Sequence, residues 1–232
     1  MLKKAQILFF GLVLVCTDMF AINIVIEKDF YQPSLKTLND EFVNMGIPNF
    51  KGSSDLNGLN VLIGGSSDKL EGVYFGFGYW QGNTLINTSV ITASSTIDII
   101  PIYLRFDFPV FTLKTRDNKS DILGILFEID SVLAFSVLDL DSKSSGATGS
   151  TSWSISQNTN MQSLSFGLGA KIGVEYFIIQ NTLSIKGSVG YLLDIADGQL
   201  RDDSFKYVTT SGEPVAVNIG GSKAGISICF HL

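Results

Sequence analysis

Apolar and polar side chains alternate with a period of two residues along most of the chain. In the stretch 182–196, Lys186 and Asp194 lie on one face, and the other face carries Leu183, Ile185, Val189, Tyr191, Leu193 and Ile195. This alternation predicts β-strands with one apolar face. Counted back from the C-terminus, the strands are expected at 215–232, 182–196, 160–178, 122–139, 95–111, 71–82 and 56–65, and residues 22–27 supply an eighth.

The segments between these strands alternate in length. Long connections are expected at 28–55, 83–94, 140–159 and 197–214, short ones at 66–70 and 179–181, and one of intermediate length at 112–121. An even number of antiparallel strands, with long loops at one end and short turns at the other, is typical of a membrane-spanning β-barrel. The connection Asp141–Asn160 is rich in Ser, Thr, Gly and Asn, which predicts a flexible surface loop.

The charged residues of the long strands gather on the face opposite the apolar one. They are Arg105, Asp107, Glu128, Asp130, Lys171, Glu175, Lys186, Asp194 and Lys223. Asp98, near the outer end of its strand, is the exception. A soluble β-sandwich would bury the apolar face and have shorter strands, whereas a Lys or Arg at a bilayer midplane costs about 2–4 kcal/mol. The pattern therefore favours an all-β, eight-stranded antiparallel up-and-down transmembrane barrel with apolar residues facing lipid.

These nine inward-facing charged residues would lie in a narrow interior, because an eight-stranded barrel is only wide enough to be filled by side chains. Buried charges need partners to offset their desolvation. We therefore predict a network of salt bridges that closes the lumen. The alternative is a narrow or gated pore lined by the same groups.

Composition agrees with a barrel. Hydrophobic residues make up 45% of the 232 residues and the mean hydropathy is +0.30, as expected when apolar faces alternate with polar ones. A net charge of −6 argues against nucleic acid as a partner, because it provides no basic surface for phosphates.

The N-terminus is predicted to be a cleavable leader. A basic start and the apolar run Ala5–Val15 indicate a signal peptide over 1–21, too short for a spanning helix, which leaves 22–232 as the barrel. Cys16 would be lipidated in a lipoprotein, but the large residue before it makes that the weaker alternative. Cleavage leaves Cys229 as the only cysteine, so no internal disulfide is expected.

One segment has a helical period instead. Leu35, Leu38, Phe42 and Met45 recur at helical spacing, with a capping Ser before them and Gly46 after them. We predict a short amphipathic helix at 34–46 in the first long loop. A helix resting on the barrel rim is the first interpretation, and a plug in the barrel mouth is the second.

No residue pattern indicates catalysis, a cofactor or a metal. His231 is the only histidine and lies at the predicted periplasmic end. Glu128 and Asp130 would be about 7 Å apart on one face, and basic residues of neighbouring strands are their expected partners. Asp197 with the pair Asp202–Asp203 matches no calcium loop and predicts a solvated acidic patch.

The closing stretch 215–232, with Phe230 near its end, resembles the C-terminal strand of bacterial outer-membrane β-barrels. The whole predicted plan is similar to that of the OmpA transmembrane domain and OmpX-type proteins, although the terminal residue is Leu232 where many such proteins end in Phe. The resemblance implies localisation in the bacterial outer membrane, outer-membrane lipids as neighbours, and recognition of the closing strand by the outer-membrane assembly machinery. A monomer is expected, and the extracellular partner is unknown.

Three functions fit this plan. The first is a structural or surface-interaction protein that displays its outer loops, as an adhesin does. The second is a narrow porin-like channel for small or apolar solutes, and the third is a lipid-modifying enzyme. The filled lumen and the lack of a catalytic pattern favour the first.

Overall fold

A closed β-barrel forms most of the structure. The computed structural model describes residues 21–33, 40, 56–66, 72–87, 91–115, 121–148, 151–180, 182–196, 198–202, 205–206 and 215–232. The barrel strands are β1 (Ala21–Pro33), β2 (Leu56–Ser66), β3 (Gly72–Asn87), β4 (Ile91–Lys114), β5 (Asp121–Thr148), β6 (Thr151–Ile179), β7 (Leu183–Ala196) and β12 (Gly221–His231). Four two-residue strands lie between β7 and β12: β8 (Gly198–Gln199), β9 (Arg201–Asp202), β10 (Phe205–Lys206) and β11 (Ala216–Val217).

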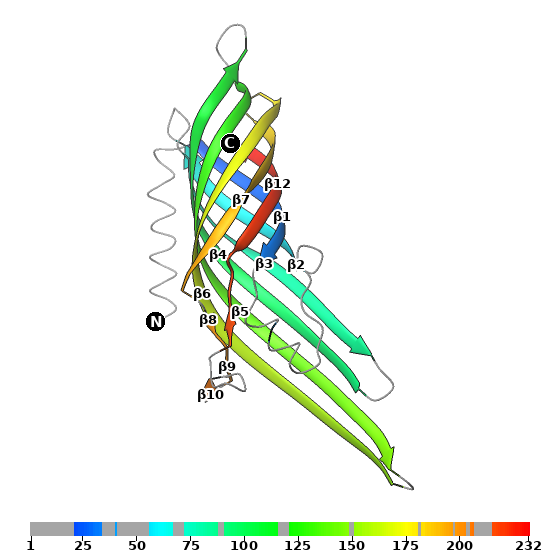
Figure 1. The fold of residues 1–232 in the computed structure, drawn as a ribbon. Coiled ribbons are helices and arrows are strands. Elements are labelled where there is room, and N and C mark those ends of the chain that lie inside the picture. Colours follow the sequence, from blue (N-terminus) through cyan, green and yellow to red (C-terminus); the bar gives the residue numbers. More distant parts are fainter. Residues whose placement is uncertain are drawn as a thin grey trace.

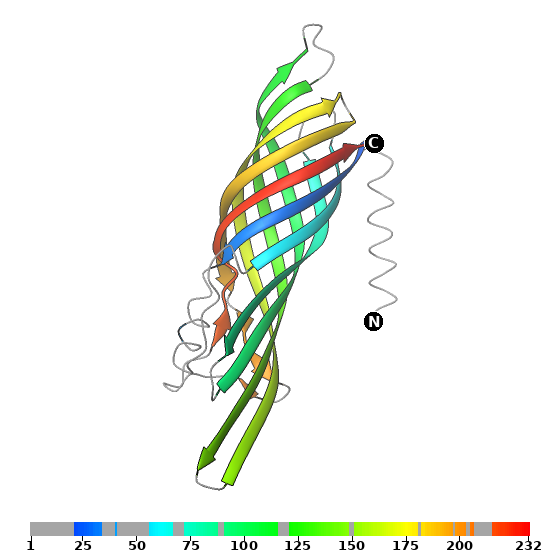
Figure 2. The ribbon, with the colours of Figure 1, turned by 90° about the vertical axis from the view of Figure 1, so that its right-hand side faces the viewer.

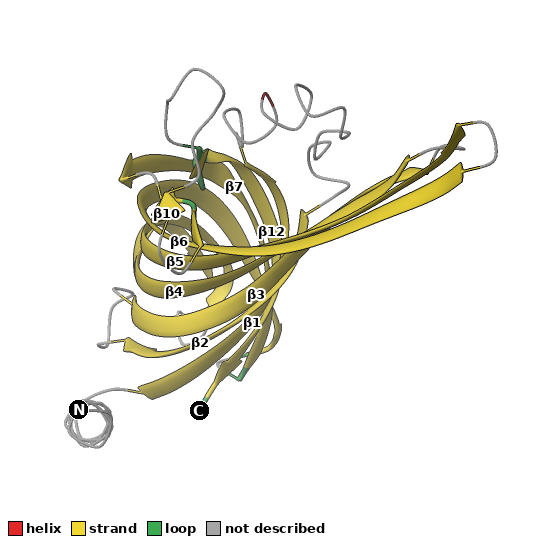
Figure 3. Cartoon of the chain, turned by 90° about the horizontal axis from the view of Figure 1, so that it is seen from below, coloured by secondary structure: helices red, strands yellow, loops and turns green. Residues whose placement is uncertain are grey.

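The eight long strands pair in the order in which they follow one another in the chain. Each is antiparallel to its neighbour, β7 pairs with both β6 and β12, and β12 pairs with β1, so the sheet closes into a ring. Figures 1 and 2 show the strands tilted around a common axis, and Figure 3 shows them curving around one interior. The predicted fold class, an eight-stranded antiparallel up-and-down barrel, is confirmed.

Alternation of side chains places the two faces of each strand as the sequence predicted. On β4, Ile100, Ile102 and Leu104 are exposed, whereas Ile99, Tyr103 and Arg105, which have the opposite parity, are buried. The same parity holds on the other barrel strands. Because successive side chains of a strand point to opposite faces, the outside of the barrel is apolar and its interior takes the charged residues.

Two hairpins are longer than the sequence predicted. Residues 83–94 and 140–159 were expected to be long loops, but β3 and β4 stay paired out to Asn87 and Thr92, and β5 and β6 out to Thr148 and Thr151. Beyond Leu138 the β5–β6 ladder adds about 30 Å at 3.3 Å per residue. We call the end from which these hairpins project the loop end; the C-terminus lies at the opposite, short-turn end (Figure 1).

The predicted closing strand 215–232 is interrupted. β11 pairs with β8 in a separate two-stranded sheet, and β12 begins only at Gly221. Residues 218–220, between β11 and β12, belong to no strand. Residues 215–219 therefore fold against β8 at the loop end and do not extend the barrel wall.

Two predictions lie outside the described residues: the signal peptide, apart from Ala21, and the helix at 34–46, apart from Asp40. None of the described helical residues forms a helix long and apolar enough to cross a membrane.

Candidate functional site

The centre of the lumen is organised around Arg105 of β4. Its two terminal nitrogens donate to the two carboxylate oxygens of Glu27 on β1, each at 2.9 Å, and its Nε donates to Asp130 Oδ1 at 2.7 Å. The β4–β5 register sets Asp130 directly opposite Arg105. Two-point contacts between a guanidinium and a carboxylate are among the strongest hydrogen bonds in proteins, and Arg105 is only 1% exposed.

Two lysines extend this arrangement toward the short-turn end. Lys171 Nζ on β6 lies 2.9 Å from Glu128 Oε2 and 3.3 Å from Asp130 Oδ2. Lys186 Nζ on β7 lies 2.5 Å from Glu128 Oε1 and 3.3 Å from Asp107 Oδ2. Glu128 of β5 therefore joins the lysines of β6 and β7.

A third lysine carries the contacts toward the loop end. Lys223 Nζ on β12 lies 2.8 Å from Asp29 Oδ2 on β1 and donates to Tyr103 Oη at 3.1 Å. The same ammonium lies 4.6 Å from the centre of the Tyr103 ring and 5.4 Å from that of Trp80, a favourable cation–π arrangement. Asn60 donates to Asp29 and accepts a hydrogen bond from the Trp80 indole at 3.2 Å.

These residues form one connected group, which we call the charge cluster. Its members are Glu27, Asp29, Arg105, Asp107, Glu128, Asp130, Lys171, Lys186 and Lys223. All are buried. Since each ion has opposite charges within contact distance, the cost of removing it from water is offset by its neighbours, and the side chains fill the centre of the lumen.

A separate polar group lies at the short-turn end. His231 Nε2 lies 3.0 Å from Ser184 Oγ and 3.2 Å from Glu175 Oε1, and its Nδ1 lies 3.2 Å from Asn23 Oδ1. Serine, histidine and amide are spaced as in a nucleophilic site. However, Ser184 is fully buried and its hydroxyl donates to Glu175, so this arrangement ties β1, β6, β7 and β12 together and leaves no accessible nucleophile at Ser184.

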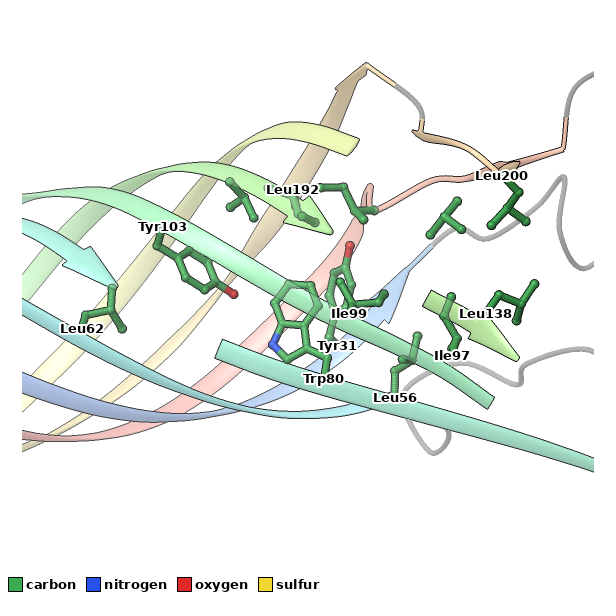
Figure 4. Close-up of a cluster of buried hydrophobic side chains, with 14 of the residues drawn as sticks. Tyr31, Leu56, Leu62, Trp80, Ile97, Ile99, Tyr103, Leu138, Leu192 and Leu200 are labelled. Carbon is green, nitrogen blue, oxygen red and sulfur yellow. The ribbon is translucent and has the colours of Figure 1, made fainter. Parts of the chain in front are cut away.

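Apolar side chains fill the lumen at the loop end. They come from β1 to β7 and from the segment between β7 and β12, and we call them the mouth cluster: Tyr31, Leu56, Trp80, Ile97, Ile99, Leu138, Met161, Leu192, Leu200, Val215, Val217 and Ile219. Figure 4 shows Leu200, Leu138 and Ile97 toward one end of the cluster, with Trp80 and Tyr31 nearer its centre. Trp80 also contacts Lys223 of the charge cluster. Gly58 gives the Trp80 ring room, because a Cβ there would overlap it.

Three hydrogen bonds from side chains of the barrel wall to backbone groups hold the β8 and β11 segments, which we call the mouth segment, in place. Ser165 Oγ on β6 donates to the Val217 carbonyl at 2.8 Å and accepts from the Gly198 amide at 3.1 Å. Asp194 Oδ2 accepts from the Ile219 amide at 2.6 Å. A side chain at Gly198 would collide with Ser165 and the Leu164 backbone, so this close approach requires glycine.

The structure thus distributes the nine predicted lumen residues over three places. Seven lie in the charge cluster, Glu175 lies beside His231, and half-buried Asp194 holds the mouth segment. Sequence analysis missed Glu27 and Asp29, which pair with Arg105 and Lys223 respectively. The signal was present, because both share the face of Asn23 and alternate with Ile22, Ile24 and Ile26. The mouth segment was also missed, since 215–219 continues the period-two pattern of β12.

The described residues contain no group of three or more His, Cys, Asp or Glu side chains arranged to hold a metal ion. Acidic residues of the charge cluster are instead engaged by Arg105 and the three lysines. The chemistry of the lumen is therefore that of paired charges.

The closed ring, the apolar exterior and the filled interior define the class of protein: a small eight-stranded transmembrane-type β-barrel. Closed barrels satisfy every backbone group within the sheet and are one of the two structures able to span a bilayer. Bacterial single-chain barrels of this kind lie in the outer membrane, so the predicted localisation agrees with the architecture.

Comparisons with known proteins add a distant likeness of fold. No known protein family and no curated protein matches the sequence. Among solved structures, the chain is similar to Neisserial surface protein A (TM-score 0.45, 13% identity, covering 92% of this chain and 97% of that one). It is also similar to the N-terminal β-barrel domain of Pseudomonas aeruginosa OprF (TM-score 0.31, 10% identity, covering 92% and 98%). The fold assignment rests on the strand pairing.

Proposed function

We propose that this protein is a non-catalytic outer-membrane surface-interaction protein, in which a closed barrel serves as a rigid base for the β3–β4 and β5–β6 hairpins. The observation that carries the proposal is the continuation of these two hairpins beyond the barrel at the loop end. A channel would need an open lumen, whereas here the charge cluster and the mouth cluster occupy it. Rigid scaffolds commonly present binding surfaces on projecting connections.

A labelling experiment tests the orientation that this function requires. Asn160 is exposed at the base of the β5–β6 hairpin and Thr182 is exposed in the turn at the opposite end. On intact cells, a membrane-impermeant maleimide should modify Asn160→Cys and leave Thr182→Cys unmodified until the outer membrane is opened. The reverse result would mean that the hairpins face the periplasm and would rule out surface display.

A second experiment tests the interaction itself. In the short-hairpin variant, residues 142–157 are replaced by Asn-Gly, which favours the tight turn of a two-residue hairpin between the paired residues Asp141 and Asn158. Cells that display the wild type should adhere to cultured host cells or to one another, and the short-hairpin variant at equal surface abundance should lose that adhesion. Equal adhesion of both, or none with the wild type, would contradict the proposal.

A further inference from the structure

A single lysine interrupts the apolar exterior of the barrel on β1. Lys28 is exposed and points outward together with Ile26 and Phe30 on the same strand. Its register partners are Leu59 on β2 and Ile226 on β12, which are 52% and 57% exposed. Apolar side chains that face outward therefore surround Lys28 on all four sides. This position differs from that of Lys114, which pairs with Asp121 at the short-turn end.

The charge of Lys28 is not balanced by its neighbours. The charged groups of the lumen lie on the other face of β1, where Glu27 and Asp29 are fully buried. Within the described part of the chain, no acidic side chain forms an ion pair with Lys28. A lysine on the lipid face of a barrel costs about 2–4 kcal/mol at the bilayer midplane and close to nothing near the interface, so the ammonium must reach an anion or water at the nearer rim.

The barrel wall is short on this side, which brings that rim within reach. β1 ends at Pro33, β2 begins at Leu56 and β12 begins at Gly221, whereas the walls on β5 and β6 continue far beyond. Asn57, exposed and facing outward, lies opposite Phe30 and diagonal to Lys28. Diagonal neighbours on adjacent strands are about 7–8 Å apart, within reach of a long side chain.

We propose that Lys28 and Asn57 form an external binding site for the phosphate of an anionic membrane lipid in the leaflet at the loop end. The ammonium snorkels along Phe30 and Leu59 toward the headgroups and donates a charge-assisted hydrogen bond to the phosphate. The amide of Asn57 supplies a second donor, and the acyl chains lie on Leu59, Ile226 and Ile26. This inference rests on the proposed membrane location.

Native mass spectrometry of the refolded full chain tests the site. The protein is released from micelles that contain equal amounts of phosphatidylglycerol and phosphatidylcholine. The wild type should retain one phosphatidylglycerol with roughly five-fold preference, the factor that about 1 kcal/mol for one lysine near an anionic surface provides. Lys28→Gln should abolish the preference for phosphatidylglycerol, so that both lipids are retained about equally, and Lys114→Gln should keep the preference. Heat modifiability on gels confirms that each variant is folded, since both side chains lie outside the core.

Several outcomes would overturn the inference. Equal retention of the two lipids by the wild type, or an unchanged preference in Lys28→Gln, would mean that Lys28 binds no lipid phosphate. Displacement of the lipid by millimolar inorganic phosphate would mean that the site takes soluble anions. Flotation with vesicles separates this inference from the proposed function: a wild type that fails to insert overturns both, whereas one that inserts without lipid preference overturns only the lipid site.

Discussion

At the scale of single residues, Arg105 shows why the buried charges stabilise the barrel only as a group. Its guanidinium forms ion pairs with both Glu27 and Asp130. Glu27 also lies 3.4 Å from Lys171 Nζ and 3.7 Å from Lys223 Nζ. Most ions of the charge cluster have two or more oppositely charged partners, whereas Asp107 pairs only with Lys186 and Asp29 only with Lys223 among the described residues. Removing one buried partner leaves uncompensated charge, which is far more costly than breaking a surface pair.

We expect Arg105→Ala to lower the free energy of unfolding by about 3–5 kcal/mol, because Glu27 and Asp130 lose a buried counter-ion. Urea unfolding in lipid vesicles, followed by heat modifiability on gels, measures this change. Lys114→Ala is the matched control: Lys114 is half exposed and pairs with Asp121 at 3.8 Å, so its loss should cost less than about 1 kcal/mol. Similar values for the two variants would show that water reaches the charge cluster.

The sequence predicted which side chains face the lumen better than it predicted their partners. Parity alone assigns Glu128 and Lys171 to the interior, because alternation is a local property of a strand. That Lys223 contacts Asp29 and Tyr103 depends on barrel closure and on register between strands distant in sequence. Asp29 was missed because the first strand was expected to end at residue 27, whereas β1 continues to Pro33. Glu27 lay within that expected strand, but only the charged residues of the longer strands were assigned to the lumen.

At the scale of elements, the mouth segment closes the loop end by packing and by very few polar contacts. Ser165 contributes two of them, with Val217 and Gly198, and is itself fully surrounded by protein. A buried backbone group that loses its hydrogen-bond partner costs about 1–3 kcal/mol. The Ser165 hydroxyl therefore makes two of the three hydrogen bonds described above that attach the mouth segment to the barrel wall.

Ser165→Ala should loosen the mouth segment without unfolding the barrel. The Gly198 amide loses its acceptor, so its hydrogen exchange should become roughly ten-fold faster, as a loss of about 1.4 kcal/mol of local stability implies. The control is Ser163→Ala on the same strand, since the buried Ser163 hydroxyl has no hydrogen-bond partner among the described residues. Faster exchange in both variants, or in neither, would contradict a specific role for Ser165.

Removal of the projecting part of the β5–β6 hairpin should leave the barrel intact. Beyond Asp141 this hairpin pairs mainly within itself and with β4, and the charge cluster lies well within the ring. We expect the short-hairpin variant to change the free energy of unfolding by less than about 1 kcal/mol, since long surface connections contribute little to core stability. A larger loss, measured by urea unfolding, would show that the hairpin supports the wall.

Strand ends were the part of the elements that the sequence did not predict. Residues 140–159 are rich in Ser, Thr and Asn, which suit loops, yet a paired backbone satisfies its own donors and acceptors whatever the side chains are. Residues 215–219 show the opposite case, because their alternation suits a strand but their pairing is with β8. Local pattern determines the face of a residue, whereas the partner strand determines where the ladder stops.

At the scale of the whole molecule, the lumen is closed by two layers of different chemistry. The charge cluster fills its centre, and the mouth cluster covers the centre at the loop end. A passing ion would have to displace salt bridges and then cross apolar side chains. Neither layer provides the continuous wet path that conduction requires.

In planar bilayers, the wild type should therefore give no stable conductance steps, with an unrelated porin recorded in the same bilayers as the positive control. Ser165→Ala should also remain silent, because the charge cluster beneath the mouth segment is unchanged. Reproducible openings of the wild type would favour the channel hypothesis over surface interaction.

The meeting of β1 with β12 has a consequence for how this barrel is made. Glu27 arrives on the first barrel strand, yet it contacts Lys171, 144 positions later, and Ser227, 200 positions later. A half-built sheet would hold Arg105 and Lys171 without one of their acids, so an open intermediate must keep those ions hydrated. Pairing of β1 with β12 and exclusion of water from the lumen then occur in the same step, which makes folding slow and all-or-none.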